Sequence, residues 1–313
     1  MVPILAVLLA AVCFATTGTA QALAGVDASA LSVGAARILV GGGILGVIAL
    51  VGSARRRRGE GHGRRAAASG RRTVGGLPTW AIIAIGAAGV LAYQPAFFAG
   101  TRLNGVAIGT VVALGSAPIF TGVLNAVIRR RLPTRRWVVA TGVSLVGVVL
   151  VSGVVTGSSP AGSGAIEASG ILASLGAGAS YALYAIASKL LLDRGWGPAG
   201  AMGSIFGAAA IISVPVVLSS PVAWLVTPAG LALVLWLGVV TTAIAYLLFG
   251  WGLERLAPTT VSTLTLAEPL VATLLGLLVL HEQLAAVSVV GLVVMAAGLG
   301  VLTLPSPQSR PSQ

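Results

Sequence analysis

Charged side chains are scarce in this sequence. Only 8% of its 313 residues are charged, whereas 57% are hydrophobic, and the mean hydropathy is +1.01. A soluble chain of this length cannot bury so much apolar surface, because the surface area of a folded protein falls too slowly with its size. The composition therefore excludes a soluble globular protein and predicts an all-α chain embedded in lipid.

Cysteines, histidines and acids are too few for several kinds of chemistry. Cys13 is the only cysteine and lies in an apolar segment, so neither a disulfide framework nor a metal cluster is expected. His62 and His281 are the only histidines, and seven acidic residues leave nothing for paired-carboxylate catalysis. We therefore expect no enzyme activity and no cofactor, and a polytopic membrane enzyme is the less favoured class. The net charge of +12 comes from arginines and lysines in loops without interleaved aromatics, which argues against nucleic-acid binding.

Long apolar runs are abundant. A bilayer-crossing helix needs roughly 20 apolar residues, and ten runs of about that length are present. A cleaved signal peptide is the competing interpretation of the first run, but no positive charge precedes it. The predicted spans cover residues 2–22, 30–52, 79–100, 105–128, 136–155, 169–191, 199–219, 229–253, 258–280 and 285–304.

The chain contains a weak internal repeat. At an offset of 151, Pro118 pairs with Pro269 and Gly147 with Gly298, and a slightly larger offset pairs Tyr93 with Tyr246. The repeat predicts two five-helix units, at 1–152 and 168–304, separated by a linker at 153–167 and followed by a tail at 305–313. Because five is an odd number, the second unit enters the membrane from the opposite side, so the two repeats are expected to be inverted.

The positive charges set the orientation. If the N-terminus is cytoplasmic, 17 of the 19 basic residues lie on the inner side, as the positive-inside rule requires, and both termini are inside. Arg131 and Glu282 occupy matching positions of the two repeats, and the exchange of their charge fits loops that face opposite sides. We interpret the arginine-rich stretch 55–72 as a solvated retention signal, with binding of anionic lipid as the alternative.

Glu268 is the outstanding polar residue within a span. It lies ten residues after Pro258, near the predicted midplane, and Pro269 follows it. Pro269 lacks an N–H and should free the carbonyl of Thr265, and Pro118 should break the fourth helix at the matching position. Interrupted helices in inverted repeats indicate a central substrate site. The functional interpretation of Glu268 is a proton carrier or a ligand for an amine, and the structural alternative is a protonated acid that stabilises the kink.

Other polar groups are also expected deep in the spans. Arg37 is predicted to bind a substrate carboxylate, to pair with Glu268, or to extend to the interface. The tyrosines at 93 and 246 are too deep to be interfacial anchors, so they either line the pathway or form ordinary interhelical hydrogen bonds. The same two alternatives apply to Gln94, Tyr181 and Tyr184.

Two segments resemble a known family. The segment 246–302, with its Glu268–Pro269 pair and the HEQL turn, resembles the C-terminal part of an EamA repeat of the drug/metabolite transporter superfamily. The segment 93–132 is similar but carries Ala117 before its proline and Arg131 where that family usually has an acid. The resemblance implies ten helices in two inverted repeats around a central cavity, and secondary transport of small metabolites.

The resemblance also implies a cellular role. Similar members are mostly inner-membrane exporters of amino acids or related compounds, often linked to protons. We therefore expect a proton-linked exporter in the bacterial cytoplasmic membrane that works by alternating access, with a small-molecule substrate and membrane lipid as its partners. An uncoupled facilitator or a channel is the alternative, and the sequence leaves the oligomeric state open.

Overall fold

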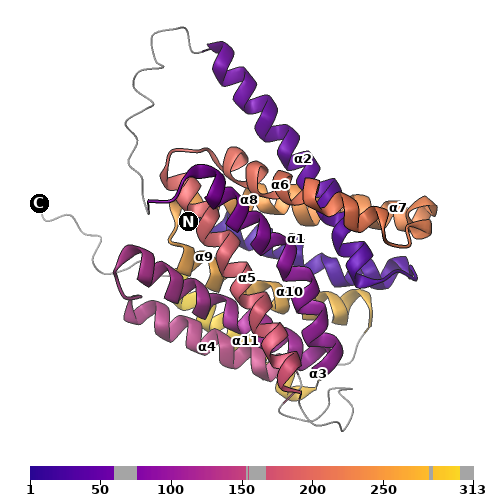
Figure 1. The fold of residues 1–313 in the computed structure, drawn as a ribbon. Helices are drawn as coiled ribbons and strands as arrows, with labels where there is room; N and C mark the ends of the chain where they lie inside the picture. The colour runs from indigo at the N-terminus through magenta and orange to yellow at the C-terminus, as the bar shows by residue number, and fades with distance from the viewer. Residues whose placement is uncertain (60–75, 153, 155–166, 282–284, 304–313) are drawn as a thin grey trace, which may run out of the picture.

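The computed structural model describes residues 1–59, 76–152, 154, 167–281 and 285–303, and these residues contain helices and no strand (Figure 1). Glu282, the tail at 305–313 and most of the expected linker lie outside this part of the chain. The helices are α1 (Val2–Ala24), α2 (Ala30–Gly59), α3 (Thr79–Arg129), α4 (Arg135–Val151), α5 (Ala168–Asp193), α6 (Pro198–Leu218), η2 (Ala223–Val226), α7 (Pro228–Leu235), η3 (Trp236–Ile244), α8 (Ala245–Arg255), α9 (Pro258–Leu264), α10 (Ala267–Val279) and α11 (Ala286–Thr303).

Most of these helices are long and apolar enough to cross a membrane. Within the described residues nine segments satisfy both conditions, and α4, with 17 residues, is shorter than any of them. The expected loop between 100 and 105 is not formed, because α3 continues through it and turns only at Gly105, whose φ of 81° favours glycine. The span expected at 229–253 consists of α7, η3 and α8, and the one at 258–280 consists of α9 and α10.

Small residues allow the helices to pack closely. α2 packs along α6, α4 lies beside α11, and α3 packs along α5 (Figure 1). At the crossing of α2 and α6, a Cβ on Gly46 would lie 3.2 Å from the Cα of Gly207, so the two backbones are nearly in contact. Large apolar side chains such as Leu50 and Ile211 lie on the outside and are 70% and 74% exposed, as expected of a surface covered by lipid.

One end of the bundle is basic and tightly linked. Arg129 forms an ion pair with Asp193, and Lys189 donates to the Leu253 carbonyl at 2.8 Å. Arg136 bonds to the carbonyl of Val301, which ties α4 to the end of α11. We call this the basic end; its described cations include Arg55, Arg129, Arg130, Arg131, Arg135, Arg136, Lys189, Arg194 and Arg255.

The other helix ends meet on the far side of the bundle. Asn104, near the kink of α3, donates to the Glu167 carbonyl at 2.9 Å and accepts from the Glu167 N–H at 2.7 Å. Ser32, near the start of α2, donates to the carbonyl of Pro221. Successive connections thus gather at alternate ends, as expected for helices that run up and down. We call this second side the opposite end.

Candidate functional site

A central cavity opens between the helices in the half of the bundle nearer the opposite end. Its volume is about 730 Å³, and it is bordered by α1, α2, α3, α4, η3 and α10. Its walls reach the helix ends at Ala22, Ser152 and Leu280. The residues singled out from the sequence that line it include Arg37, Tyr93, Gln94, Glu268 and Pro269.

Glu268 faces this cavity from a broken helix. α9 ends at Leu264 and α10 begins at Ala267, so the interruption comes immediately before Glu268, which lies in the first turn of α10. The Thr265 carbonyl is not left free as expected, because it accepts the Glu268 N–H at 2.9 Å. With the residues that the structure describes, the Glu268 side chain forms no hydrogen bond or ion pair. Its carboxyl group is therefore available to a ligand or a proton.

Arg37 crosses the cavity wall and binds a neighbouring helix. Its Nε donates to Thr242 Oγ1 at 3.0 Å, and one terminal nitrogen donates to the Thr241 carbonyl at 2.9 Å. Both partners belong to η3, a π-helical segment in which Thr242 Oγ1 also donates to the Leu237 carbonyl. Among the described residues Arg37 forms no ion pair with Glu268. The guanidinium is held in the cavity wall.

The remaining tyrosines lie beside the cavity and not in its lining. Tyr181 and Thr265 are buried, and their hydroxyls are 3.0 Å apart. Tyr246 donates to the Tyr184 hydroxyl at 3.3 Å, and its ring packs on Phe206 at 4.0 Å between centroids. This cluster connects α5, α6 and α8 to the break that precedes Glu268. The structure therefore favours interhelical bonding for these residues, whereas Tyr93 lines the cavity and stacks on Phe97.

The matching break expected at Pro118 is absent. α3 remains helical through Pro118, and its only residue with non-helical dihedral angles is Gly105. A proline inside a helix removes one hydrogen bond without ending the helix when neighbouring groups satisfy the carbonyl. In the described residues a helix break thus accompanies Pro269 and not Pro118.

Several cavity-lining residues were not singled out from the sequence. Phe14 and Phe97 supply aromatic surface, and Thr110 and Thr273 supply hydroxyls. An isolated threonine or phenylalanine in an apolar run gives no signal of which face it occupies. By contrast, Thr17, Thr19 and Gln21, which also line the cavity, can be recognised from the sequence as polar residues in the outer half of the first predicted span.

Below the cavity the bundle is packed solid toward the basic end. Val7, Leu45, Leu191 and Leu253 are 0% exposed, and Phe206 is 1% exposed. These side chains belong to one contiguous buried cluster, to which α1, α2, α5, α6 and α8 contribute. The cavity is therefore accessible from the opposite end alone in this conformation, as far as the described residues show.

Comparison with known proteins identifies the family. The model of the EamA-like transporter family matches residues 1–153 and 168–304. The chain belongs to the EamA-like transporter family. This match confirms the resemblance inferred from the residues around Glu268 and Pro269.

The relatives and a solved structure agree with this assignment. The chain is 34% identical to the uncharacterized transporter YwfM of Bacillus subtilis (strain 168), over 95% of this chain and 92% of the relative. It is 30% identical to protein PecM of Dickeya dadantii (strain 3937), over 70% of this chain and 72% of that protein. A crystal structure matches 96% of the chain, and 98% of its own length, with a TM-score of 0.73 at 21% identity, which supports the fold.

These findings establish the general class. The chain is an integral membrane transporter built from helices, and both the family and the names of the relatives point to a transporter rather than an enzyme. A transporter of this family implies a small-molecule substrate.

Proposed function

We propose that the protein exports small metabolites, such as amino acids, in exchange for protons, by alternating access across the bacterial cytoplasmic membrane. The observation that carries this proposal is the cavity of about 730 Å³, which presents Glu268 and Arg37 to one space between the two halves of the chain. Carboxylates and guanidinium groups inside a membrane protein are costly, and they are kept where they act on a substrate or a proton.

Arg37 and Glu268 carry opposite charges and are therefore suited to bind a zwitterionic substrate. Arg37 uses two nitrogens on Thr242 and the Thr241 carbonyl, and its remaining donors are free to bind a carboxylate in the cavity. Glu268 lies across the same cavity and is available to an ammonium group. An amino acid would place one charge on each residue.

Glu268 is proposed to carry the proton. When the cavity faces outward, the carboxylate takes up a proton and an outward-bound substrate ammonium leaves. After the halves rearrange, the proton is released to the cytoplasm and the carboxylate binds the next substrate. One proton moves inward for each substrate that moves outward, and the proton gradient drives the exchange.

We infer that ten helices form two inverted five-helix repeats, with α4 as the fifth. Contacts between α4 and α11 support this relation. A Cβ on Gly147 would lie 2.5 Å from Met295 N, and a Cβ on Gly298 would lie 2.6 Å from Ser144 N. At an offset of 151, Gly147 corresponds to Gly298 and Ser144 to Met295, so each contact becomes the other when the halves are exchanged.

Contacts between α2 and α6 are reciprocal in the same way, with an offset of 161 residues between the two halves. Gly42 approaches the carbonyl of Phe206, and Gly203 approaches the carbonyl of Leu45. Exchange of the halves converts Gly42 into Gly203 and Leu45 into Phe206. Such reciprocal contacts are expected of a pseudo-two-fold axis between repeats that enter the membrane from opposite sides.

The closed side is proposed to be cytoplasmic. The basic end carries most of the described cations, and cationic loops resist translocation. The present conformation would then face outward, with the ion pair between Arg129 and Asp193 and the contact of Lys189 with α8 closing the inner side. Both contacts would have to open in the inward-facing conformation.

Transport into vesicles with an imposed pH gradient tests the proposal. A metabolite screen by thermal shift first selects a substrate, and its transport is then measured with and without the gradient. We expect Glu268→Gln to insert normally but to lose gradient-driven transport, because a carboxamide cannot exchange a proton. Glu254→Gln, outside the cavity, is the matched control and should retain coupling. Unchanged coupling in Glu268→Gln would refute the role of Glu268, and gradient-independent transport by the native chain would favour an uncoupled facilitator.

A further inference from the structure

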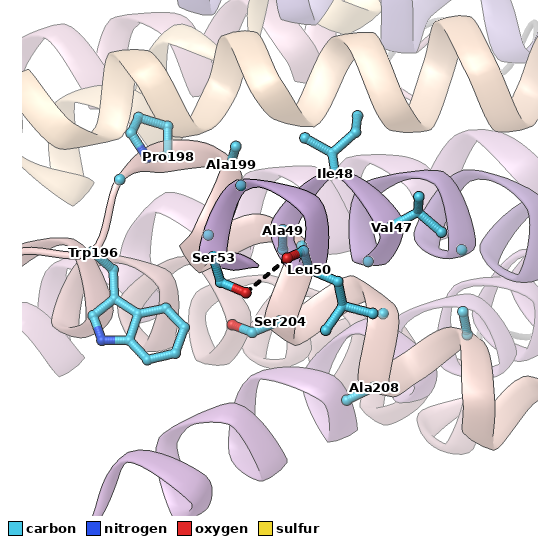
Figure 2. Close-up of a pocket in the computed structure, with 18 of the residues that line it drawn as sticks. Val47, Ile48, Ala49, Leu50, Ser53, Trp196, Pro198, Ala199, Ser204 and Ala208 are labelled. Atoms are coloured by element: carbon cyan, nitrogen blue, oxygen red, sulfur yellow. Dashed lines mark hydrogen bonds between the residues drawn. The ribbon is translucent and has the colours of Figure 1, made fainter. Parts of the chain in front are cut away.

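A second cavity lies on the outside of the bundle, along α2 and α6 (Figure 2). Its volume is about 980 Å³, and it is separate from the central cavity. Glycines form its floor, and a Cβ on Gly43 would meet no atom within 4 Å, so the groove is open at that position. Its walls are almost entirely aliphatic, and they include the exposed side chains Val47, Leu50 and Ile211.

The groove has polar groups at one end only. Ser53, Ser204 and Trp196 lie together at that end, whereas Val47 and Ala208 lie toward the other (Figure 2). The two serine hydroxyls donate to carbonyls one turn back, at 2.8 Å and 3.0 Å, so their oxygens are left to accept a hydrogen bond. Tryptophan is typical of the headgroup level of a bilayer.

Positive charge follows directly after this polar end. Arg55 is exposed two residues beyond Ser53, and α2 continues to Gly59 through three further arginine positions, 56 to 58. An apolar groove that ends at a basic turn matches the two parts of an anionic lipid, an acyl chain and a phosphate. Arginine suits a phosphate because its planar fork donates two parallel hydrogen bonds.

A second copy of the chain fits this surface less well. A symmetric dimer across the groove would place the same patch of both chains together. The exposed Arg55 of one chain would then lie at the same end of the contact as Arg55 of the other, and their repulsion would oppose the contact. The groove is also open to the bilayer, where acyl chains and not water cover apolar surface.

We propose that this groove is a binding site for an anionic phospholipid of the leaflet at the basic end. One acyl chain lies along α2 and α6, and Arg55 binds the phosphate. The oxygens of Ser53 and Ser204 accept hydrogen bonds from headgroup hydroxyls, so phosphatidylglycerol fits the polar end. The site depends on the membrane location of the chain and is independent of the proposed proton coupling.

Native mass spectrometry of the purified, delipidated full chain tests the headgroup contact. Phosphatidylglycerol and phosphatidylcholine with identical acyl chains are added at equal concentrations. We expect the native chain to prefer phosphatidylglycerol, and Arg55→Gln to reduce this preference about fivefold, as removal of one basic residue at an anionic surface predicts. Arg102→Gln, which removes an exposed charge at the opposite end, should change nothing. Equal losses in Arg55→Gln and Arg102→Gln would overturn the proposal.

A second pair of variants tests the acyl-chain contact. Gly43→Leu fills the groove and should reduce binding of both lipids at least tenfold. Gly142→Leu adds the same side chain at another helical glycine with no atom within 4 Å, on α4, and should bind both lipids normally. Thermal melting verifies that each variant is folded, and Gly43→Ala replaces Gly43→Leu if it is not. The lipid site would be refuted if Gly43→Leu bound both lipids as the native chain does, or if a headgroup without acyl chains displaced the bound lipid. It would also be refuted if the native chain formed a dimer without lipid and Gly43→Leu did not.

Discussion

Two ionisable side chains, Arg37 and Glu268, line the central cavity, where a charged group is costly. Glu268 has no partner among the described residues, whereas Arg37 is fixed by two hydrogen bonds to η3. A structural ion pair would have satisfied both groups at once, and the observed arrangement leaves the carboxyl group exposed to the cavity. At the scale of residues, Arg37 is therefore held by the protein, and we propose Glu268 as the group that exchanges a proton.

Substitution of Arg37 tests this difference between the two side chains. We expect Arg37→Ala to lower stability by about 2 kcal/mol, because the Thr241 carbonyl loses a charged donor. Arg37→Lys should recover part of the stability but bind carboxylate substrates more weakly, since an ammonium cannot contact both partners and the substrate in the same plane. Thermal melts with a carboxylate substrate and its methyl ester measure the two effects. The preference for the acid over the ester should be smaller in Arg37→Lys than in the native chain, and an undiminished preference would contradict the assignment.

At the scale of helices, one proline interrupts its segment and its counterpart does not. Pro269 follows the break between α9 and α10, whereas α3 passes through Pro118. The interruption places Glu268 in the first turn of a new helix, where the end of the dipole favours a negative charge. The break thus coincides with an acidic residue, whereas an alanine, Ala117, precedes Pro118 in the continuous helix.

Alanine variants of the two prolines should behave differently. Pro118→Ala should raise the thermal stability and retain transport, because it restores a hydrogen bond within a helix that is already continuous. Pro269→Ala should retain insertion but reduce the transport rate, since α9 and α10 can then approach a straight helix and shift Glu268. Melting curves and initial rates in vesicles measure these effects. A greater transport defect in Pro118→Ala would be inconsistent with the observed helices.

The sequence was sufficient for some features and insufficient for others. Apolar runs predict spans because hydrocarbon thickness sets helix length, and Glu268 was found because a carboxylate in a span is rare. The position of Tyr246 within its predicted span did not show that this residue lies outside the cavity lining. Position along a helix does not determine which face of the helix points inward. The partners of Arg37 depend on the π-helical turn of η3, which no local residue pattern indicates.

At the scale of the whole molecule, the reciprocal glycine contacts hold the two halves together. Gly147→Val should disrupt the contact of α4 with α11 and lower stability strongly, because the added side chain would overlap the backbone of Met295. Gly142→Val, one and a half turns away in a position with no atom within 4 Å, is the matched control and should be nearly neutral. Thermal melting of both variants in one detergent makes the comparison. Equal melting temperatures would mean that α4 and α11 do not pack as described.

The arrangement also explains the uneven charge of the chain. The basic end is sealed by packed side chains and ionic contacts, and the opposite end leads into the cavity. Under the proposed inverted repeats, the backbones of the two ends would be equivalent, and the same architecture could adopt an inward-facing and an outward-facing conformation. In this proposal the positive charge determines which end lies in the cytoplasm.

The insertion of the two halves in opposite directions is tested most directly by labelling single cysteines in cells. Cys13 is the only native cysteine, and Arg130 and His281 are both exposed and lie at corresponding turns of the two halves. In a Cys13→Ala background, we expect His281→Cys to react with a membrane-impermeant maleimide in intact cells, and Arg130→Cys to react only after permeabilisation. Reaction of both cysteines from the same side would contradict the inverted arrangement.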